Sequence, residues 1–213
     1  MFNLDPVRIL MALPAVLIGL SFHEFAHAFA SDRLGDPTPR NQGRLTLSPL
    51  PHIDIIGLIL IALAGFGWAK PVQVNTSYYK NPKRDDIIVS LAGPFMNLVL
   101  AFVFTVLFKV AIDFNASSYT GGGLYDIILN MLYYAIQINI MLFVFNLIPI
   151  PPLDGFHVLS NVISARGYRL IYTLQQYGSI ILILIVVTPV SRYIISPPIK
   201  FLLNGMLSLM GIV

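Results

Sequence analysis

The chain contains no cysteine, and only 11% of its 213 residues are charged. The lack of cysteine excludes disulfide bonds and thiolate metal sites, so any metal ion must be held by nitrogen and oxygen ligands. Soluble domains carry about 25% charged residues, whereas this chain is 56% hydrophobic with a mean hydropathy of +0.78. These values indicate an integral membrane protein. The net charge of +3 is too small to indicate a nucleic-acid partner.

The apolar residues form six stretches separated by more polar segments. A spanning helix needs about 20 residues, so the second and shortest stretch is predicted to enter and leave the bilayer on one side. The predicted fold is an all-α polytopic membrane protein with about six transmembrane or re-entrant helices. The stretches cover residues 7–30, 54–69, 87–112, 124–148, 170–187 and 193–213.

The first stretch ends in Ala28-Phe29-Ala30, which is similar to a signal-peptide cleavage site. A positively charged leader region is nearly missing, however, because Asp5 offsets Arg8. Polar residues also interrupt the apolar run before the cleavage point, so we expect this stretch to remain in the protein.

Basic residues predict the orientation in the membrane. Residues 31–86 contain seven Lys and Arg residues, whereas 113–123 contain none. By the positive-inside rule the first segment is cytoplasmic and the second lies outside. The first span then runs from outside to inside, and His23 lies about 11 Å from its cytoplasmic end at 1.5 Å per residue. We therefore expect the active site to lie toward the cytoplasmic side of the cell membrane.

The chain has one glutamate, Glu24, and it lies within His23-Glu24-Phe25-Ala26-His27, an HExxH motif. Residues four apart share a helix face, so both imidazoles can bind one ion while Glu24 lies beside them as a general base. Zinc lowers the pKa of its bound water toward about 7, which makes metal-assisted hydrolysis the predicted chemistry. The alternative is that both histidines hydrogen-bond neighbouring helices, although ionisable groups inside a membrane are costly without a function.

A third ligand is predicted at Asp154. Three prolines between Asn146 and Asp154 must break the fourth apolar helix, so we expect Asp154 on unwound backbone at the level of His27. Two histidines and one aspartate leave one coordination position of a catalytic zinc open, and one Zn²⁺ per chain is expected. The alternatives for Asp154 are a helix cap or a proline-rich turn at the interface.

These motifs together resemble the site-2 protease family of intramembrane zinc metalloproteases. Besides HExxH, the family's NxxPxPxxDG pattern matches Asn146 to Gly155, and its GPxxN pattern matches Gly93-Pro94-Phe95-Met96-Asn97. The match is to the minimal-core bacterial or archaeal type, without a PDZ or CBS domain. The resemblance implies one domain over residues 1–213, with a catalytic core in about 7–165 and additional helices in about 168–213.

The resemblance also implies a substrate class. Family members cleave transmembrane segments of membrane proteins near the cytosolic side, usually after another protease has trimmed the external part. It further implies that Asn97 and Asn146, with Gly93 and Pro94, line the substrate cleft. For Asn97, interhelical packing beside a Gly-Pro kink is an equally good interpretation.

Two short segments, 43–48 and 70–75, alternate polar and apolar residues as strands do. They predict a small membrane-associated β element whose edge would bind an extended substrate by strand addition. A capping loop without a substrate role is the alternative interpretation.

Two further histidines, His52 and His157, could bind metal by residue type alone. The family pattern assigns neither as a ligand, and His157, three residues after Asp154, is better placed to support a ligand than to be one.

The predicted partners are transmembrane protein substrates and the lipid bilayer, and a homo-oligomer is compatible with the sequence. The rival function is a membrane metal transporter or metal-binding protein that uses the same His and Asp side chains. Transporters place ionisable residues along a path across the bilayer, whereas here the outer halves of the spans have few. Hydrolysis of a lipid is a further alternative, because the same metal chemistry permits it.

Overall fold

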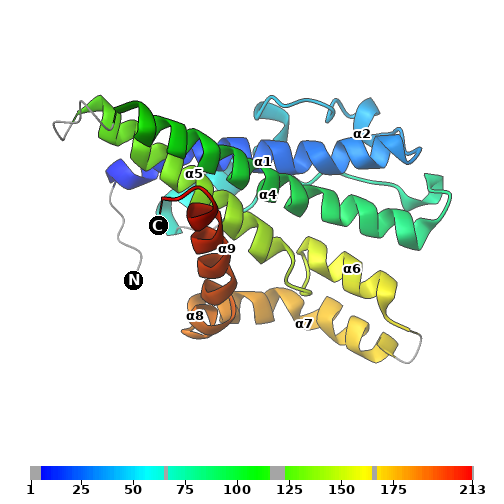
Figure 1. Cartoon of the computed structure of the whole chain (residues 1–213). Coiled ribbons are helices and arrows are strands. Elements are labelled where there is room, and N and C mark those ends of the chain that lie inside the picture. The colour runs from blue at the N-terminus through cyan, green and yellow to red at the C-terminus, as the bar shows by residue number, and fades with distance from the viewer. Residues whose placement is uncertain (1–5, 65–66, 116–122, 165–166, 213) are drawn as a thin grey trace.

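The structure is a computed structural model that describes residues 6–64, 67–115, 123–164 and 167–212 (Figure 1). Over these residues it is helical, with no strand. Two 3₁₀ turns, η1 (Leu50–His52) and η2 (Thr76–Tyr78), accompany the helices. The helices are α1 (Pro6–Arg33), α2 (Thr38–Asn41), α3 (Ile55–Ala64), α4 (Pro82–Asn115), α5 (Leu124–Asn146), α6 (Asp154–Val162), α7 (Tyr168–Val187), α8 (Val190–Ile194) and α9 (Ser196–Leu209).

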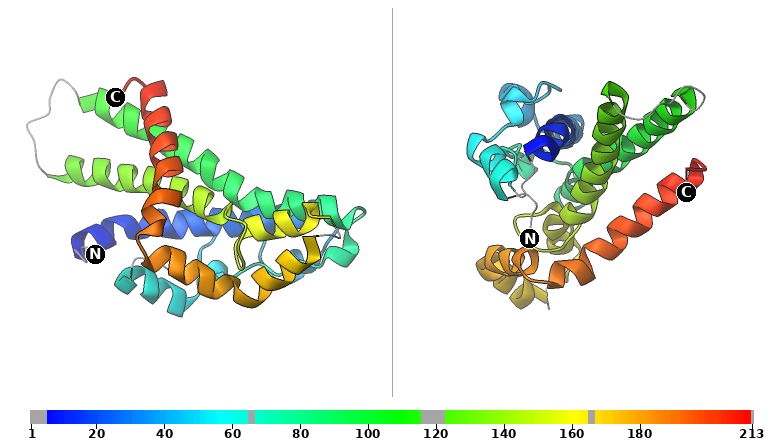
Figure 2. Two further views of the ribbon diagram at one scale, coloured as in Figure 1. Left: turned by 90° about the horizontal axis from the view of Figure 1, so that it is seen from below. Right: turned by 90° about the vertical axis from the view of Figure 1, so that its left-hand side faces the viewer.

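Three long helices, α1, α4 and α5, pack against one another and form the centre of the molecule (Figures 1 and 2). Small residues on their facing sides allow close approach of the backbones, as in other membrane helix bundles. Ala28 and Ala101 are fully buried, and a Cβ on Gly19 would lie 3.0 Å from a methyl group of Leu142 on α5. The HExxH residues lie on α1 and Asn97 lies on α4 of this bundle.

Within the described residues, four helices are long and apolar enough to cross a membrane, namely α1, α4, α5 and α7. They expose large apolar side chains such as Leu107 and Ile183, which suit contact with lipid. The expectation of a spanning helix in residues 193–213 is wrong. The prolines at 189, 197 and 198 start new helices there, and α9, with 14 residues, is about 21 Å long, which is shorter than the roughly 30 Å hydrocarbon layer.

Helix α9 packs across α5 and α4 (Figure 2). Leu203 and Leu207 of α9 join Ala101, Ile136 and Ile140 in the buried apolar cluster. Helix α9 therefore braces the α4–α5 pair.

Helix α3 has ten residues, which makes it about 15 Å long and too short to cross a bilayer. The two flanks of this segment meet, because Lys70 N donates to the His52 carbonyl at 2.9 Å. The chain therefore returns to its starting level after α3, as the short apolar stretch 54–69 predicted. Residues 65–66 of that stretch lie outside the described residues.

The predicted β element is absent from segments 43–48 and 70–75, both of which are described. Side chains form hydrogen bonds with backbone N–H and C=O groups that would otherwise pair between two strands. The Lys70 carbonyl accepts from Arg44, Val72 N donates to Glu24 at 2.8 Å, and Asn75 N donates to Asp36 at 2.7 Å. The alternation of polar and apolar residues thus reflects an extended segment tied down by side chains.

Candidate metal centre

Helix α1 presents His23 and His27 on one face, one turn apart. Their Nε2 atoms lie 3.0 Å from each other, and their side chains are buried between α1 and α4. Four-residue spacing on a helix produces this approach directly. The sequence prediction that both imidazoles point to one place is therefore met by the geometry.

Helix α4 fixes the orientation of both rings. His23 Nδ1 lies 2.7 Å from Asn97 Oδ1, and His27 Nδ1 lies 2.7 Å from the Val89 carbonyl. Both partners are acceptors, since the Asn97 amide nitrogen donates to the Gly19 carbonyl at 3.0 Å. Each Nδ1 must then carry the hydrogen, and in the neutral rings each Nε2 presents a lone pair.

Gly93 makes room for the two rings. A Cβ built at this position would lie 2.3 Å from His27 Nε2 and 2.7 Å from His23 Cε1. Any side chain would therefore displace an imidazole from the site. This close approach accounts for the glycine of the GPxxN motif. Pro94, the next residue, is buried inside α4.

Asp154 brings a carboxylate to the same point. Its Oδ2 lies 3.2 Å from His23 Nε2 and 3.4 Å from His27 Nε2. Asp154 is the first residue of α6, so the expectation of unwound backbone holds only for the segment before it. A Cβ at Gly155 would lie 2.4 Å from the Leu147 carbonyl, and this close approach lets α6 start directly against the end of α5.

The three donor atoms fit a zinc ion. They lie 3.0 to 3.4 Å apart, and tetrahedral zinc with bonds of about 2.0–2.1 Å places neighbouring donors roughly 3.3 Å apart. Asp154 Oδ2 is buried without a hydrogen-bond partner. Two imidazole lone pairs and a carboxylate facing one another repel unless a cation lies between them, and two His with one Asp is a set that zinc prefers.

Glu24 lies next to His23 on α1, but its carboxylate is held by loops outside the helix. Val72 N donates to Glu24 Oε2 at 2.8 Å, and Arg44 Nη2 lies 3.8 Å from the same oxygen. Neither contact was predicted from the sequence, where Arg44 is one of many loop cations.

The other predicted residues lie outside this cluster. Asn146 donates to the Leu142 carbonyl within α5 at 3.0 Å. His157 Nδ1 lies 3.9 Å from Asp86 Oδ2, and no contact of the described residues joins it to the metal-facing groups. His52 is buried, with Nε2 2.9 Å from the Thr46 carbonyl.

A buried amide of the helix bundle was also missed. Asn139 of α5 accepts from the Asn97 amide at 3.0 Å and is fully buried. The apolar stretch 124–148 contains four amide side chains, those of Asn130, Gln137, Asn139 and Asn146. Polar groups within membrane helices need partners, and this is the signal that could have drawn attention to Asn139.

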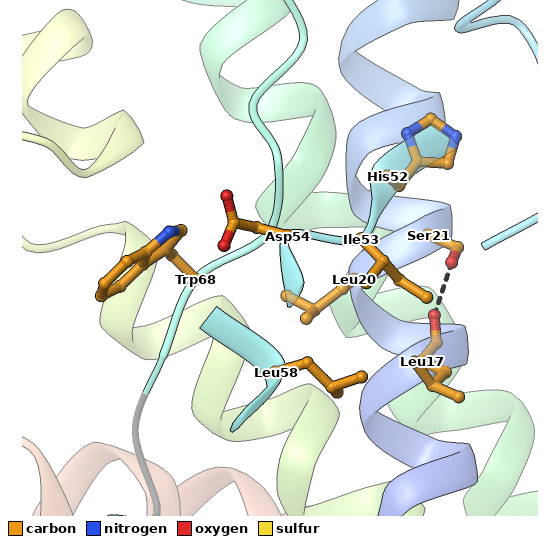
Figure 3. Close-up of a pocket in the computed structure, with 8 residues that line it drawn as sticks. All are labelled: Leu17, Leu20, Ser21, His52, Ile53, Asp54, Leu58 and Trp68. Carbon is orange, nitrogen blue, oxygen red and sulfur yellow. Dashed lines mark hydrogen bonds between the residues drawn. The ribbon is translucent and has the colours of Figure 1, made fainter. Parts of the chain in front are cut away.

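A small pocket lies beside α1, one turn before the histidines (Figure 3). Its lining is mostly apolar, with Leu17 and Leu20 from α1 and Leu58 from α3. In Figure 3, Asp54 and Trp68 flank the two ends of the α3 segment. The pocket marks where this segment rests on the first helix.

Imidazole and carboxylate donors gathered within a bundle of apolar helices are the features of an integral membrane metalloprotein. The chain belongs to peptidase family M50, the site-2 proteases, whose family model matches residues 11–188. The resemblance seen in the sequence motifs is thereby confirmed.

Three relatives share the name "Putative zinc metalloprotease". YwhC of Bacillus subtilis is 36% identical over 187 residues, which cover 85% of this chain and 82% of the relative. Rip2 of Mycolicibacterium smegmatis is 29% identical over 185 residues, covering 84% and 68%. MJ0611 of Methanocaldococcus jannaschii is 32% identical over 158 residues, covering 74% and 73%. No solved structure matches the chain significantly.

Proposed function

We propose that this protein is a zinc-dependent endopeptidase that hydrolyses peptide bonds in or near transmembrane segments of other membrane proteins. The observation that carries the proposal is the convergence of two imidazole lone pairs and an otherwise unpartnered carboxylate oxygen within the helix bundle. Family M50 membership and the names of the relatives support a metalloprotease.

In this proposal His23, His27 and Asp154 hold one zinc ion. When bound, zinc supplies Lewis acidity, which lowers the pKa of water toward about 7. Asn97 and the Val89 carbonyl keep the two imidazoles in the tautomer that binds metal. Gly93 keeps the space in front of the rings open for the scissile peptide.

Glu24 is the general base. It takes a proton from the attacking water and passes it to the leaving amine nitrogen, a role that contributes typically 10²- to 10⁴-fold. Its position beside His23 on α1 and its burial suit this role.

The substrate must reach the site as an extended chain, since helical carbonyls are already hydrogen-bonded and hard to attack. In lipid a helix gives up these bonds only where replacements are available. We place Asn146, at the end of α5 beside the loop that leads to Asp154, at the rim of the cleft. We also place the site toward the cytoplasmic side, as the loop charges indicate.

The test is cleavage of a single-pass model substrate by the purified, reconstituted protein and its Glu24→Gln variant. Gln keeps the size of the side chain but cannot accept the proton, so turnover should fall by about 10²-fold or more. Zinc content, measured by atomic absorption, should not change. Retention of more than about a tenth of the wild-type rate would contradict general base catalysis by Glu24.

A further inference from the structure

Arg44 lies between α2 and η1, and its guanidinium is buried beside the carboxylate of Glu24. The residue is 4% exposed, and its Nη2 lies 3.8 Å from Glu24 Oε2. Nη1 donates to the Pro51 carbonyl, and Nη2 donates to the Lys70 carbonyl. A planar guanidinium that bonds two separate loops is fixed in direction as well as in place. The charge facing Glu24 therefore has a set position.

A second contact of Glu24 depends on the same arginine. The Lys70 carbonyl accepts from Arg44, and Lys70 N donates to the His52 carbonyl at 2.9 Å. These two bonds hold Lys70 from both sides. Val72, two residues further on, then donates its backbone N–H to Glu24 Oε2 at 2.8 Å. Loss of Arg44 would remove one of these two bonds and loosen the segment that carries this donor.

We propose that Arg44 is a positioning residue for Glu24, acting directly through its charge and indirectly through the 70–72 segment. The inference rests on the proposed function, in which Glu24 is the general base. Both observed contacts fall on Oε2, so the arrangement assigns Oε1 to take the proton from water and to return it to the leaving amine. Arginine suits this place because it stays charged even when buried, and a buried carboxylate without such a neighbour is costly.

The kinetic test compares Arg44→Met with Arg40→Met in the purified full-length chain. Arg40 is a matched control, since it is an exposed arginine of the neighbouring helix α2 and pairs with Asp32 at 2.7 and 2.9 Å. We expect Arg44→Met to lower kcat about tenfold or more, because small displacements of catalytic groups can cost up to 10²-fold. KM should stay within about twofold and zinc content should not change, since neither substrate binding nor a metal ligand is altered. A kcat equal to that of Arg40→Met would overturn the proposal.

A thermal unfolding cycle separates positioning of Glu24 from simple bracing of the loops. The wild type, Arg44→Met, Glu24→Gln and the double variant are compared in detergent, with Arg44→Gln in place of Met if the Met variant does not fold. Arg44→Met should lower the Tm in both backgrounds. The decrease should be smaller by about 2 °C or more in the Glu24→Gln background than in the wild type. Equal losses in both backgrounds would overturn the proposal. This cycle needs no activity, so failure of the wild type to cleave any substrate would refute the proposed function while the Arg44–Glu24 coupling remains measurable.

Discussion

At the scale of single residues, the two histidines proposed to bind zinc are oriented by groups that the HExxH motif does not contain. Asn97 holds His23, and the amide of Asn97 is itself held by the Gly19 carbonyl and by Asn139. This chain of hydrogen bonds decides which ring nitrogen of His23 carries the hydrogen and therefore which one is free to bind the proposed zinc ion. Asn97 thus has a structural role at the site, in addition to the predicted role in the substrate cleft, which stays a prediction.

Gly93 supplies a test at this scale. Gly93→Ala should lower zinc content and proteolytic activity together, because the new Cβ would lie 2.3 Å from His27 Nε2 and must push that ring out of place. Loss of the support of a ligand typically costs 10- to 100-fold in metal affinity, and we expect a loss of about this size.

The matched control is Gly205→Ala in α9, where no atom lies within 4 Å of the added Cβ. It should keep full zinc content, with a Tm equal to or slightly above that of the wild type, since Ala favours a helix. Full metal affinity in Gly93→Ala would contradict the packing described around the two imidazoles.

At the scale of the elements, the extended segment 67–75 is held against the C-terminal part of α1 by the carboxylates of Glu24 and Asp36. Asp36, fully buried after the end of α1, accepts from Ser31 Oγ at 2.8 Å, Thr38 N at 2.9 Å and Asn75 N at 2.7 Å. Burial alone would raise the pKa of Asp36, but the hydrogen bonds from these three residues outweigh it and hold the pKa below its usual range. The carboxylate therefore joins α1, α2 and the segment that carries Val72.

Asp36→Asn should reduce the stability of the protein by about 1–3 kcal/mol at neutral pH, because the amide cannot accept all three donors. A lowered pKa in the folded state means that this contribution is present above the usual pKa of about 3.9 and is lost as the pH falls through the folded-state value. The Tm difference between variant and wild type should accordingly shrink below about pH 4. The control, Asp113→Asn, removes an exposed partner of Lys109 and should change Tm by little. A constant Tm difference from pH 7 to pH 3 would show that the charge of Asp36 is not the cause.

Features that depend on residues close together in the sequence could be predicted from it. Features that depend on contacts between distant segments could not. Four-residue spacing was enough to predict that His23 and His27 share a face, and the prolines after Asn146 were enough to predict the break before Asp154. The strands were wrong because alternation in segment 70–75 does not show that its N–H groups bind Glu24 and Asp36. Arg44 was not distinguished from other loop cations, because its burial depends on contacts with loops distant in sequence.

At the scale of the whole molecule, the polar site lies between α1, α4 and α6 and nearer the C-terminal end of α1. The positive-inside rule predicts that residues 31–86 are cytoplasmic and that 113–123 are external. The chain has no native cysteine, so single cysteines introduced at Ser77 and Ser118 can be labelled without background. A membrane-impermeant maleimide added to intact cells should label position 118 and not 77. The opposite pattern would reverse the orientation and place the site toward the outer side.

The central claim is that His23, His27 and Asp154 bind one zinc ion, and zinc X-ray absorption on the purified protein tests it most directly. We predict one zinc per chain with a first shell of nitrogen and oxygen at about 2.0–2.1 Å, including scattering from two imidazoles. In Asp154→Ala the occupancy should fall, and the imidazole signal of any remaining zinc should persist. Full occupancy with an unchanged first shell in Asp154→Ala would contradict the assignment of the third ligand, and a wild-type spectrum without two imidazoles would contradict the site as a whole.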